Sequence, residues 1–260
     1  MPAVSAPRPE GAPRPAARFT TSLLLADVVP GPGWKPEVGP VTLALSLTEC
    51  CLLEGLAVPR ADLLLRAAAT LLPPLTGRIL HWGEDLFALP RRQLLLRRRR
   101  FAFVSPGHAL LPRLTLQENL TLAHVLTTKQ RAAGLVERQG RLLDQLGLTP
   151  YLGKYPRELP PRQYQLAIWA RELVKEPRLL LGVLAGQEDP HGAPALAPYL
   201  LPLLQEYHEN GRGAILLAGP WLTVVHALAD RRLVLREPDW QEEPLPRHHC
   251  HPLAAYLNVL

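Results

Sequence analysis

The chain has 260 residues, of which 47% are hydrophobic and 20% are charged. This composition excludes a wholly disordered chain, and the length gives one sizeable hydrophobic core or at most two small ones. The formal net charge of +6 suits acidic partners such as nucleic acid or the anionic inner face of a membrane, although an arginine-rich composition alone gives the same charge.

The N-terminus and the cysteines bear on the compartment of the protein. Residues 1–18 are rich in Pro, Ala and Arg and lack the apolar region of a signal peptide, so we expect a tail without fixed structure. No apolar run reaches the roughly 18 residues that a membrane-spanning helix needs. Cys50, Cys51 and Cys250 do not make a disulfide framework. We therefore expect a cytoplasmic protein that is soluble or peripheral to the inner membrane.

The chain that follows the tail alternates between strand-like and helix-like stretches. Apolar and polar residues alternate in VTLALSL, which predicts a strand, whereas the Leu/Ala-rich stretch before Pro73 has helical composition. The spacing of glycines and lysine in 31–35 does not fit a phosphate loop, so this segment is interpreted as an ordinary loop. Residues 19–40 contain one apolar patch, TTSLLLADVV, followed by a turn-rich stretch. In chain order we then expect strands over 41–47 and 52–58, a helix over 62–72, a strand, turn and short helix over 77–89, and a strand over 97–106 that is entered from the basic run Arg97–Arg100.

The second half of the chain combines helices with short, fully apolar strands. Runs such as RLLLGVL and AILLAG are typical of strands buried on both faces of a parallel sheet. In chain order we expect a helical region over 114–148, a loop and a strong helix over 155–177 with Leu166, Trp169, Ala170 and Leu173 as its apolar stripe, a strand over 178–184, a helix over 200–208, a strand over 214–219, a short helix over 226–230 and a strand over 231–237. Buried strands that alternate with helices predict an α/β fold with a largely parallel sheet.

Several stretches together carry a resemblance to one family. They are LLPPLTGRILHWGEDL, LLPRLTLQENL, the segment 147–181, GQEDP, and GAILLAG followed by HALADRRLVL. In this order and spacing they resemble the nucleotide-binding subunit of ATP-binding-cassette (ABC) transporters. The resemblance implies a P-loop-NTPase-like ABC ATPase core of the α/β class with a helical subdomain.

The resemblance also divides the chain. It implies a Pro/Ala/Arg-rich tail and loop over 1–39, an ABC ATPase domain over 40–240 with its helical subdomain at about 111–164, and a C-terminal extension over 241–260. Within the family, GQEDP and the ending HPLAAYLNVL resemble the ATPase of MCE-type (Mla) lipid transporters.

The phosphate loop is the first of five nucleotide motifs at which the chain departs from the family. Such a loop needs glycines whose N–H groups wrap the phosphates, a Lys for the β- and γ-phosphates, and a Ser or Thr for Mg²⁺. Between Pro59 and Ala69 the chain reads as about a dozen residues too short for the pattern GxxxxGK[ST]. We therefore expect the loop to be deleted.

The other four motifs have changed residues. Pro106 stands at the position of the metal-contacting Gln, and Pro220 at the position of the switch His. Val183 and Leu184 replace the Asp-Glu pair of Walker B, and apolar side chains hold no metal. The signature Leu-Ser-Gly-Gly-Gln reads Leu159, Pro160, Pro161, Arg162, Gln163, where proline removes N–H donors. We expect no catalytic residue, no nucleotide-binding residue, no cofactor and no metal.

These departures predict a catalytically inactive subunit, a pseudo-ATPase rather than an enzyme, with a structural or regulatory role in a lipid transport complex. Its expected partners are a membrane permease and an active ATPase subunit or a second copy, and not nucleic acid. As the resemblance implies, the expected permease contact comprises Ser105, Pro106, Gly107, His108 and Leu111, and the expected dimer interface includes Gln163 and Asp189.

Alternatives stay open at this point. The scaffold could serve as a free-standing binding module for a protein or small ligand, which an apolar pocket at the phosphate position would favour, or the chain could remain an ATP-binding ATPase. The cluster 248–251 (HHCH) is either a solvated segment or a metal site. The run Arg97–Arg100 is either a solvated face or a contact for anionic lipid headgroups or an acidic permease loop.

Overall fold

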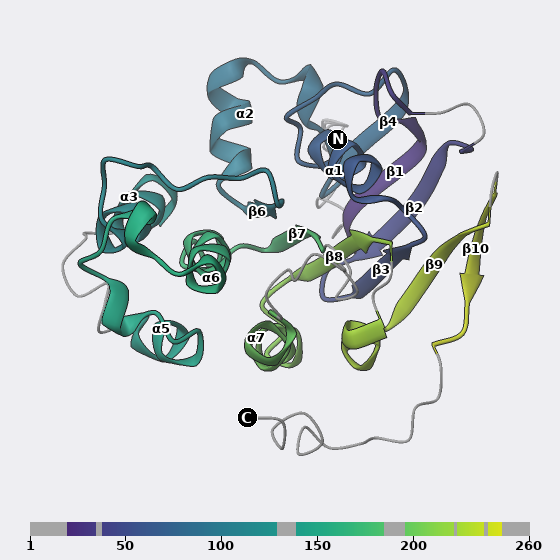
Figure 1. Cartoon of the computed structure of the whole chain (residues 1–260). Coiled ribbons are helices and arrows are strands. Elements are labelled where there is room, and N and C mark those ends of the chain that lie inside the picture. The colour runs from purple at the N-terminus through teal and green to yellow at the C-terminus, as the bar shows by residue number, and fades with distance from the viewer. Residues whose placement is uncertain are drawn as a thin grey trace, which may run out of the picture.

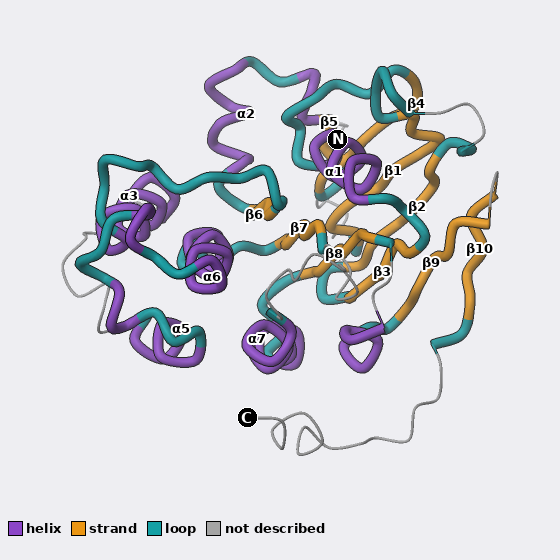
Figure 2. The backbone as a smooth tube through the Cα atoms, viewed as in Figure 1, coloured by secondary structure: helices purple, strands orange, loops and turns teal. Residues whose placement is uncertain are grey.

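Two β-sheets organise the protein (Figures 1 and 2). The computed structural model describes residues 20–34, 38–128, 139–184, 196–220, 223–236 and 239–245. A six-stranded sheet has the order β10-β9-β3-β8-β7-β6, and a four-stranded sheet has the order β2-β1-β4-β5. The expected α/β fold with a largely parallel sheet is confirmed.

The six-stranded sheet forms the centre of the molecule. Its strands are β3 (Cys50–Glu54), β6 (Phe101–Val104), β7 (Leu179–Val183), β8 (Ala214–Gly219), β9 (Arg231–Arg236) and β10 (Asp239–Glu243). All pairs are parallel except β9 with β10. Strands β3, β6, β7 and β8 are buried along their whole length, which explains why they read as unbroken apolar runs.

The four-stranded sheet is antiparallel and covers one face of the first sheet. It consists of β1 (Thr21–Val29), β2 (Val41–Ser46), β4 (Thr76–His81) and β5 (Glu84–Asp85). Burial alternates strictly along β2, so the alternation in the sequence marks a strand with one wet face. The range 1–39, expected to be a tail and loop, therefore contains an integral strand, β1. The division into three ranges otherwise stays a prediction.

Helices complete two hydrophobic layers around the central sheet. Helix α1 (Val58–Ala68) packs with the four-stranded sheet on one face, against side chains such as Cys51, Leu53 and Leu181. On the other face, Cys50, Leu52 and Leu217 contact the remaining core. Its elements are α3 (Leu116–Thr128), α5 (Gly140–Gln145), η2 (Thr149–Tyr151), η3 (Pro156–Glu158), α6 (Pro161–Leu173), α7 (Ala197–Glu209) and η4 (Thr223–Leu228).

Helix α6 packs against the central sheet through Trp169, which is 3% exposed. A Cβ at Gly182 of β7 would lie 2.8 Å from the Trp169 ring and 2.8 Å from Leu217. Gly182 is therefore the residue that admits the indole, and the expected apolar stripe of α6 is confirmed as core.

The stretches 52–58 and 97–106 differ from expectation. Strand β3 ends at Glu54, because Gly55 adopts a φ of 87° and turns the chain. Helix α1 begins at Val58, where Pro59 suits the first helical turn. The basic run lies partly in a helix, α2 (Arg91–Arg98), which follows η1 (Leu86–Ala88).

Among the described residues, no helix is long and apolar enough to cross a membrane.

Candidate functional site at the carboxyl edge of the central sheet

The carboxyl ends of the parallel strands form one edge of the six-stranded sheet. In open α/β sheets, ligands bind outside this edge. The N–H of Gly55 donates to the Pro220 carbonyl at 3.2 Å, and the N–H of Leu184 donates to the Ala218 carbonyl at 2.9 Å. The ends of β3, β7 and β8 are therefore joined, and Val183, one of the positions named from sequence, ends β7 at this edge.

The segment from Gly55 to Asp62 occupies the position of a phosphate loop, between a central strand and the helix that follows it. If the pattern GxxxxGK[ST] begins at Gly55, Arg60 stands at the second Gly, Ala61 at the Lys and Asp62 at the Ser or Thr. The predicted deletion is thus not confirmed, because the segment contains as many residues as the pattern. The difference lies in side chains and in the early start of α1.

Helix α1 presents its amino end at this edge. No side chain caps it, and its first turn contains no acidic residue. Pro59 has no N–H, and the N–H groups of Arg60 and Ala61 donate to the Ala57 carbonyl at 2.9 and 3.0 Å. The helix therefore favours an anion through the positive end of its dipole. A cavity of about 380 Å³ lies beside the helix, with Arg60, Asp62 and Arg66 among its lining residues. The lining combines these three charged side chains with apolar residues such as Pro59, Leu63 and Leu71.

Asp62 links α1 to the loop after β6. Its carboxylate accepts a hydrogen bond from the Ser105 hydroxyl at 2.5 Å and pairs with Arg66 at 2.7 Å. The Ser105 hydroxyl also accepts from the N–H of Gly107 at 3.4 Å. This arrangement fixes the loop that the sequence predicts as the permease contact.

The predicted permease contact divides into an inner and an outer part. Ser105 is only 2% exposed and faces Asp62. Pro106 and Gly107 are exposed, and Leu111 is 47% exposed. His108 is half-buried with its ring edge-on to Phe103, and burial lowers the pKa of His108. The loop therefore offers Pro106, Gly107 and Leu111 to a partner, whereas Ser105 supports the loop from inside.

The signature segment begins helix α6. Pro160 is the residue before the helix and Pro161 is its first residue. The guanidinium of Arg162 lies 4.9 Å from the ring centre of Tyr199 on α7. Gln163 is partly exposed, so the structure leaves it accessible for the predicted dimer interface. Asp189 and the cluster 248–251 lie outside the described residues.

A buried charged cluster at the same edge was missed from the sequence. Glu54, the last residue of β3, contacts His226 Nε2 at 2.5 Å and Arg232 Nη1 at 3.1 Å. The side chains of Glu54 and His226 are 4% and 5% exposed. The signal in the sequence was a glutamate at the end of an otherwise apolar run. The cluster joins β3, η4 and β9 next to Gly55.

The described residues do not offer the usual donor set for a metal. They contain no group of three or more His, Cys, Asp or Glu side chains that could hold an ion. Asp62 is engaged by Ser105 and Arg66, and Val183 ends β7 with an apolar side chain. Mg²⁺ prefers carboxylate and carbonyl oxygens, so these residues do not fit it. Burial raises the pKa of the Cys51 thiol to about 12 and also raises the pKa of the Cys50 thiol, which disfavours the reactive thiolate of both.

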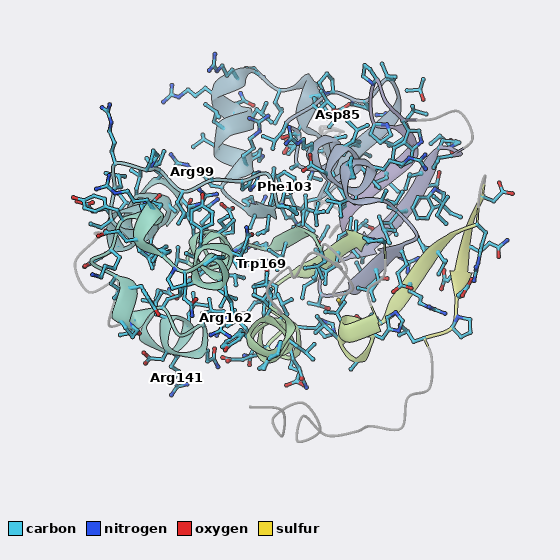
Figure 3. All side chains as sticks on the ribbon, in the orientation of Figure 1. Asp85, Arg99, Phe103, Arg141, Arg162 and Trp169 are labelled. Carbon is cyan, nitrogen blue, oxygen red and sulfur yellow. The ribbon has the colours of Figure 1, made fainter. Side chains whose placement is uncertain are left out.

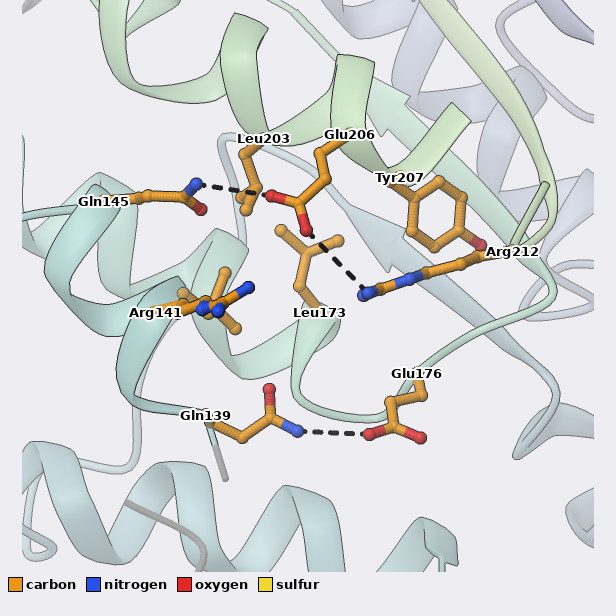
Figure 4. Close-up of a pocket in the computed structure, with 10 residues that line it drawn as sticks. Gln139, Arg141, Gln145, Leu173, Glu176, Leu203, Glu206, Tyr207 and Arg212 are labelled. Atoms are coloured by element: carbon orange, nitrogen blue, oxygen red, sulfur yellow. Dashed lines mark hydrogen bonds and ion pairs between the residues drawn. The ribbon is translucent and has the colours of Figure 1, made fainter. Parts of the chain in front are cut away.

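A second cavity lies at the opposite, amino edge of the central sheet, between α5, α6 and α7 (Figure 4). Its volume is about 330 Å³. Its side chains pair with one another, since Gln145 donates to Glu206 at 3.3 Å and Gln139 donates to Glu176 at 3.2 Å. Arg212 lies 3.9 Å from Glu206. This polar cavity is remote from the phosphate segment.

Comparison with known proteins gives several relatives. No protein-family model matches the chain. It is 28% identical over 195 residues to the methionine import ATP-binding protein MetN of Haemophilus influenzae, which covers 75% of this chain and 55% of the relative. It is 33% identical over 119 residues to the lipoprotein-releasing system ATP-binding protein LolD of Shewanella frigidimarina, which covers 45% of this chain and 49% of the relative. The chain thus spans about half the length of these curated relatives.

Solved structures share the fold. The ATP-binding subunit of an ABC transporter superposes with a TM-score of 0.70 at 22% identity, covering 92% of this chain and all of the other. CbiO1 of Clostridium perfringens, described as part of the ABC transporter complex cbiONQ, gives a TM-score of 0.66 at 17% identity, covering 88% and 90%. The comparisons support the family of ABC transporter ATP-binding subunits.

The expectation of a catalytically inactive, non-enzymatic ABC subunit is contradicted by these relatives. They are named as ATP-binding proteins of transport systems, which favours a functional ABC ATPase. Inactivity was inferred from single side chains and from a deletion that is not confirmed, whereas a helix amino end and guanidinium groups also bind phosphate. A relation to MCE-type lipid transporters is not shown, because neither relative is named as one.

Proposed function

We propose that the chain is an ATP-binding subunit of an ABC transporter and that it acts with a membrane permease. The observation that carries this proposal is the position of Gly55 and the amino end of α1 at the carboxyl end of the central strand β3. The names of the relatives support it.

In this proposal the nucleotide phosphates lie against the segment from Gly55 to Asp62. The left-handed φ of Gly55 turns the backbone after β3, and the amino end of α1, whose first turn has no acidic residue, presents the positive end of the helix dipole. Arg60 adds a guanidinium, which can bind phosphate with two parallel hydrogen bonds. Since Ala61 stands where the pattern has Lys, we expect weaker phosphate binding than a complete loop gives.

The permease would dock on the loop formed by Pro106, Gly107, His108 and Leu111. The 47% exposure of the Leu111 side chain supports this, because a leucine on a projecting loop can fill a pocket in a partner. Dimerisation through Gln163 and Asp189, with a second copy or another ATPase subunit, is the finer part of the proposal. So is a location at the inner face of a membrane.

ATP binding by the purified chain tests the nucleotide part. We expect saturable binding of ATP by calorimetry, and about tenfold weaker binding for Arg60→Ala, because a hydrogen bond to a charged group contributes about 1.5 kcal/mol. Arg157→Ala removes an exposed arginine outside the segment and is the matched control. Absence of binding at millimolar ATP, or equal affinity of Arg60→Ala and the wild type, would contradict the proposal.

Co-purification from membranes tests the permease part. We expect a membrane protein to be recovered with the wild-type chain and to be lost with Leu111→Asp, while Leu111→Asp still binds ATP. Thr121→Asp, on the helix after the loop, is the control. Recovery of the membrane protein with Leu111→Asp would place the contact elsewhere.

A further inference from the structure

Helix α2 (Arg91–Arg98) is a peripheral helix with an unusual surface. None of its residues is buried, and Figure 1 shows it at the outer edge of the molecule, beyond the strands of the central sheet. Leu95 is 49% exposed and Leu96 is 43% exposed. Two adjacent leucines in water beside a basic run need an explanation, because a short solvated helix gains nothing from them.

One face of α2 is held by the rest of the protein. Leu94 packs against the core shared by α1 and the two sheets. Arg97 makes an ion pair with Glu84 at 2.6 Å, and Arg98 Nε donates to the Thr70 hydroxyl at 2.9 Å. After the helix, the guanidinium of Arg100 lies 4.5 Å from the ring centre of Trp82. These contacts fix the rotation of the helix about its axis.

The opposite face consists of arginine and leucine. At 100° per residue, Arg91, Leu95 and Arg99 form one ridge, and Arg92 and Leu96 form the ridge beside it. We call these five residues the outer face of α2. Figure 3 labels Arg99 at the foot of the helix. Within the described part of the chain, no acidic side chain forms an ion pair with Arg91, Arg92 or Arg99.

The chemistry of this face indicates which class of partner can bind it. Guanidinium groups bind phosphates, whereas the two adjacent leucines beside them require an apolar medium. An acidic peptide or a nucleic acid would satisfy the arginines and leave Leu95 and Leu96 in water. A bilayer with anionic headgroups satisfies both, because the leucines enter the boundary of the acyl chains while the arginines reach the phosphates.

We propose that the outer face of α2 binds the surface of membranes that contain anionic phospholipids. The basic run of the sequence divides at this point. Arg99 belongs to the outer face, whereas the other three arginines anchor the helix to the protein, namely Arg97, Arg98 and Arg100. The proposal needs neither nucleotide nor permease, so it can fail or succeed separately from the proposed function.

Vesicle binding by the full chain tests the charges. We expect binding to phosphatidylcholine vesicles with about a third phosphatidylglycerol, little binding to phosphatidylcholine alone, and weaker binding as salt rises. The triple variant Arg91→Gln, Arg92→Gln, Arg99→Gln should bind about a hundredfold more weakly, at about fivefold per arginine. Its matched control is Arg113→Gln, Arg141→Gln, Arg157→Gln, which has the same net charge and should bind like the wild type.

A second variant tests the leucines. Leu95→Ser with Leu96→Ser keeps every charge and should lower vesicle affinity by about tenfold, with little effect on thermal unfolding because both side chains are exposed. The proposal is overturned if the two arginine triples lose affinity equally, if the leucine variant binds like the wild type, or if no vesicle binds. It is also overturned if a polyglutamate peptide binds through Arg91, Arg92 and Arg99 while vesicles do not.

Discussion

The two edges of the central sheet carry charged clusters of opposite character. At the carboxyl edge, Glu54 lies between His226 and Arg232 with its side chain 4% exposed. At the amino edge, Glu206 lies between Gln145 and Arg212 with its side chain 42% exposed. In both clusters a glutamate lies between an arginine and a second polar side chain, within hydrogen-bonding or ion-pairing distance.

The difference in exposure decides what each cluster contributes. Water screens the exposed cluster, so its ion pair contributes little to stability. A buried carboxylate has lost its hydration and depends on its partners, so removing one partner leaves an uncompensated charge. The carboxyl edge, where the proposed phosphate segment lies, is therefore the sensitive end of the sheet, and the amino edge is tolerant.

The largest effect is expected for Glu54→Gln. This change removes the buried carboxylate from His226 and from Arg232, although Arg232 keeps its ion pair with Glu243 at 2.9 Å. It should lower the free energy of unfolding by about 3 kcal/mol. Urea denaturation measures it. As the matched control, Glu54→Leu, His226→Leu and Arg232→Met together should lose less than Glu54→Gln, because no group is left without its buried partner. A loss below about 1 kcal/mol for Glu54→Gln would remove the contrast between the edges.

An intermediate effect is expected for His81, which is buried like Glu54 but lacks an ionic partner. Its ring stacks on Phe101 at 5.1 Å, and no described group makes a hydrogen bond of good geometry with its nitrogens. Burial lowers the pKa of His81 from 6.5 to about 4, which the backbone of Ala68 partly opposes. The unfolded chain therefore binds a proton at His81 between these pH values and the folded chain does not.

Stability should accordingly fall as the pH drops from 6.5 toward 4, by up to about 3 kcal/mol from this residue. Unfolding curves at several pH values measure the slope, which His81→Leu should flatten over the same window. An unchanged slope in His81→Leu would mean that other groups cause the acid sensitivity.

The smallest effect is expected for Glu206→Gln at the amino edge. The carboxylate is 42% exposed and its ion pair with Arg212 spans 3.9 Å. We expect the free energy of unfolding to change by less than about 0.5 kcal/mol. Thermal melts of Glu206→Gln beside Glu54→Gln give the comparison directly, and a large loss for Glu206→Gln would indicate that the cavity is structurally important.

Local patterns predicted most of the fold. The alternation in Val41–Ser46 and the apolar run Leu179–Val183 predicted strands, because burial on one face or on both leaves a direct record in the sequence. The end of β3 was missed, since Leu56 is buried just as the strand residues are and the turn depends on the φ of Gly55. Helix α2 was missed because a run of arginines has no apolar periodicity.

The site was less predictable than the fold. The family resemblance singled out Val183, which ends β7 at the carboxyl edge, and assigned Leu184 and Pro220 to nucleotide motifs, which stays a prediction. It gave no sign that Glu54 meets His226 and Arg232, because these residues are far apart in the chain and meet only through strand order. The length of the phosphate segment was also misjudged from the sequence. The segment begins at the turn at Gly55, whereas the predicted strand over 52–58 included that turn.

The order of strands has a consequence for synthesis of the chain. Cys50 of β3 pairs with Ile215, and Cys51 pairs with Arg231. The central strand is therefore made roughly 160 residues before either neighbour exists. At about 5 to 20 residues per second, it waits on the order of 10 to 30 s with both edges open. During that interval the ribosome-bound chain exposes CCLLE, and chaperone capture at this stage would shorten its opportunity to aggregate.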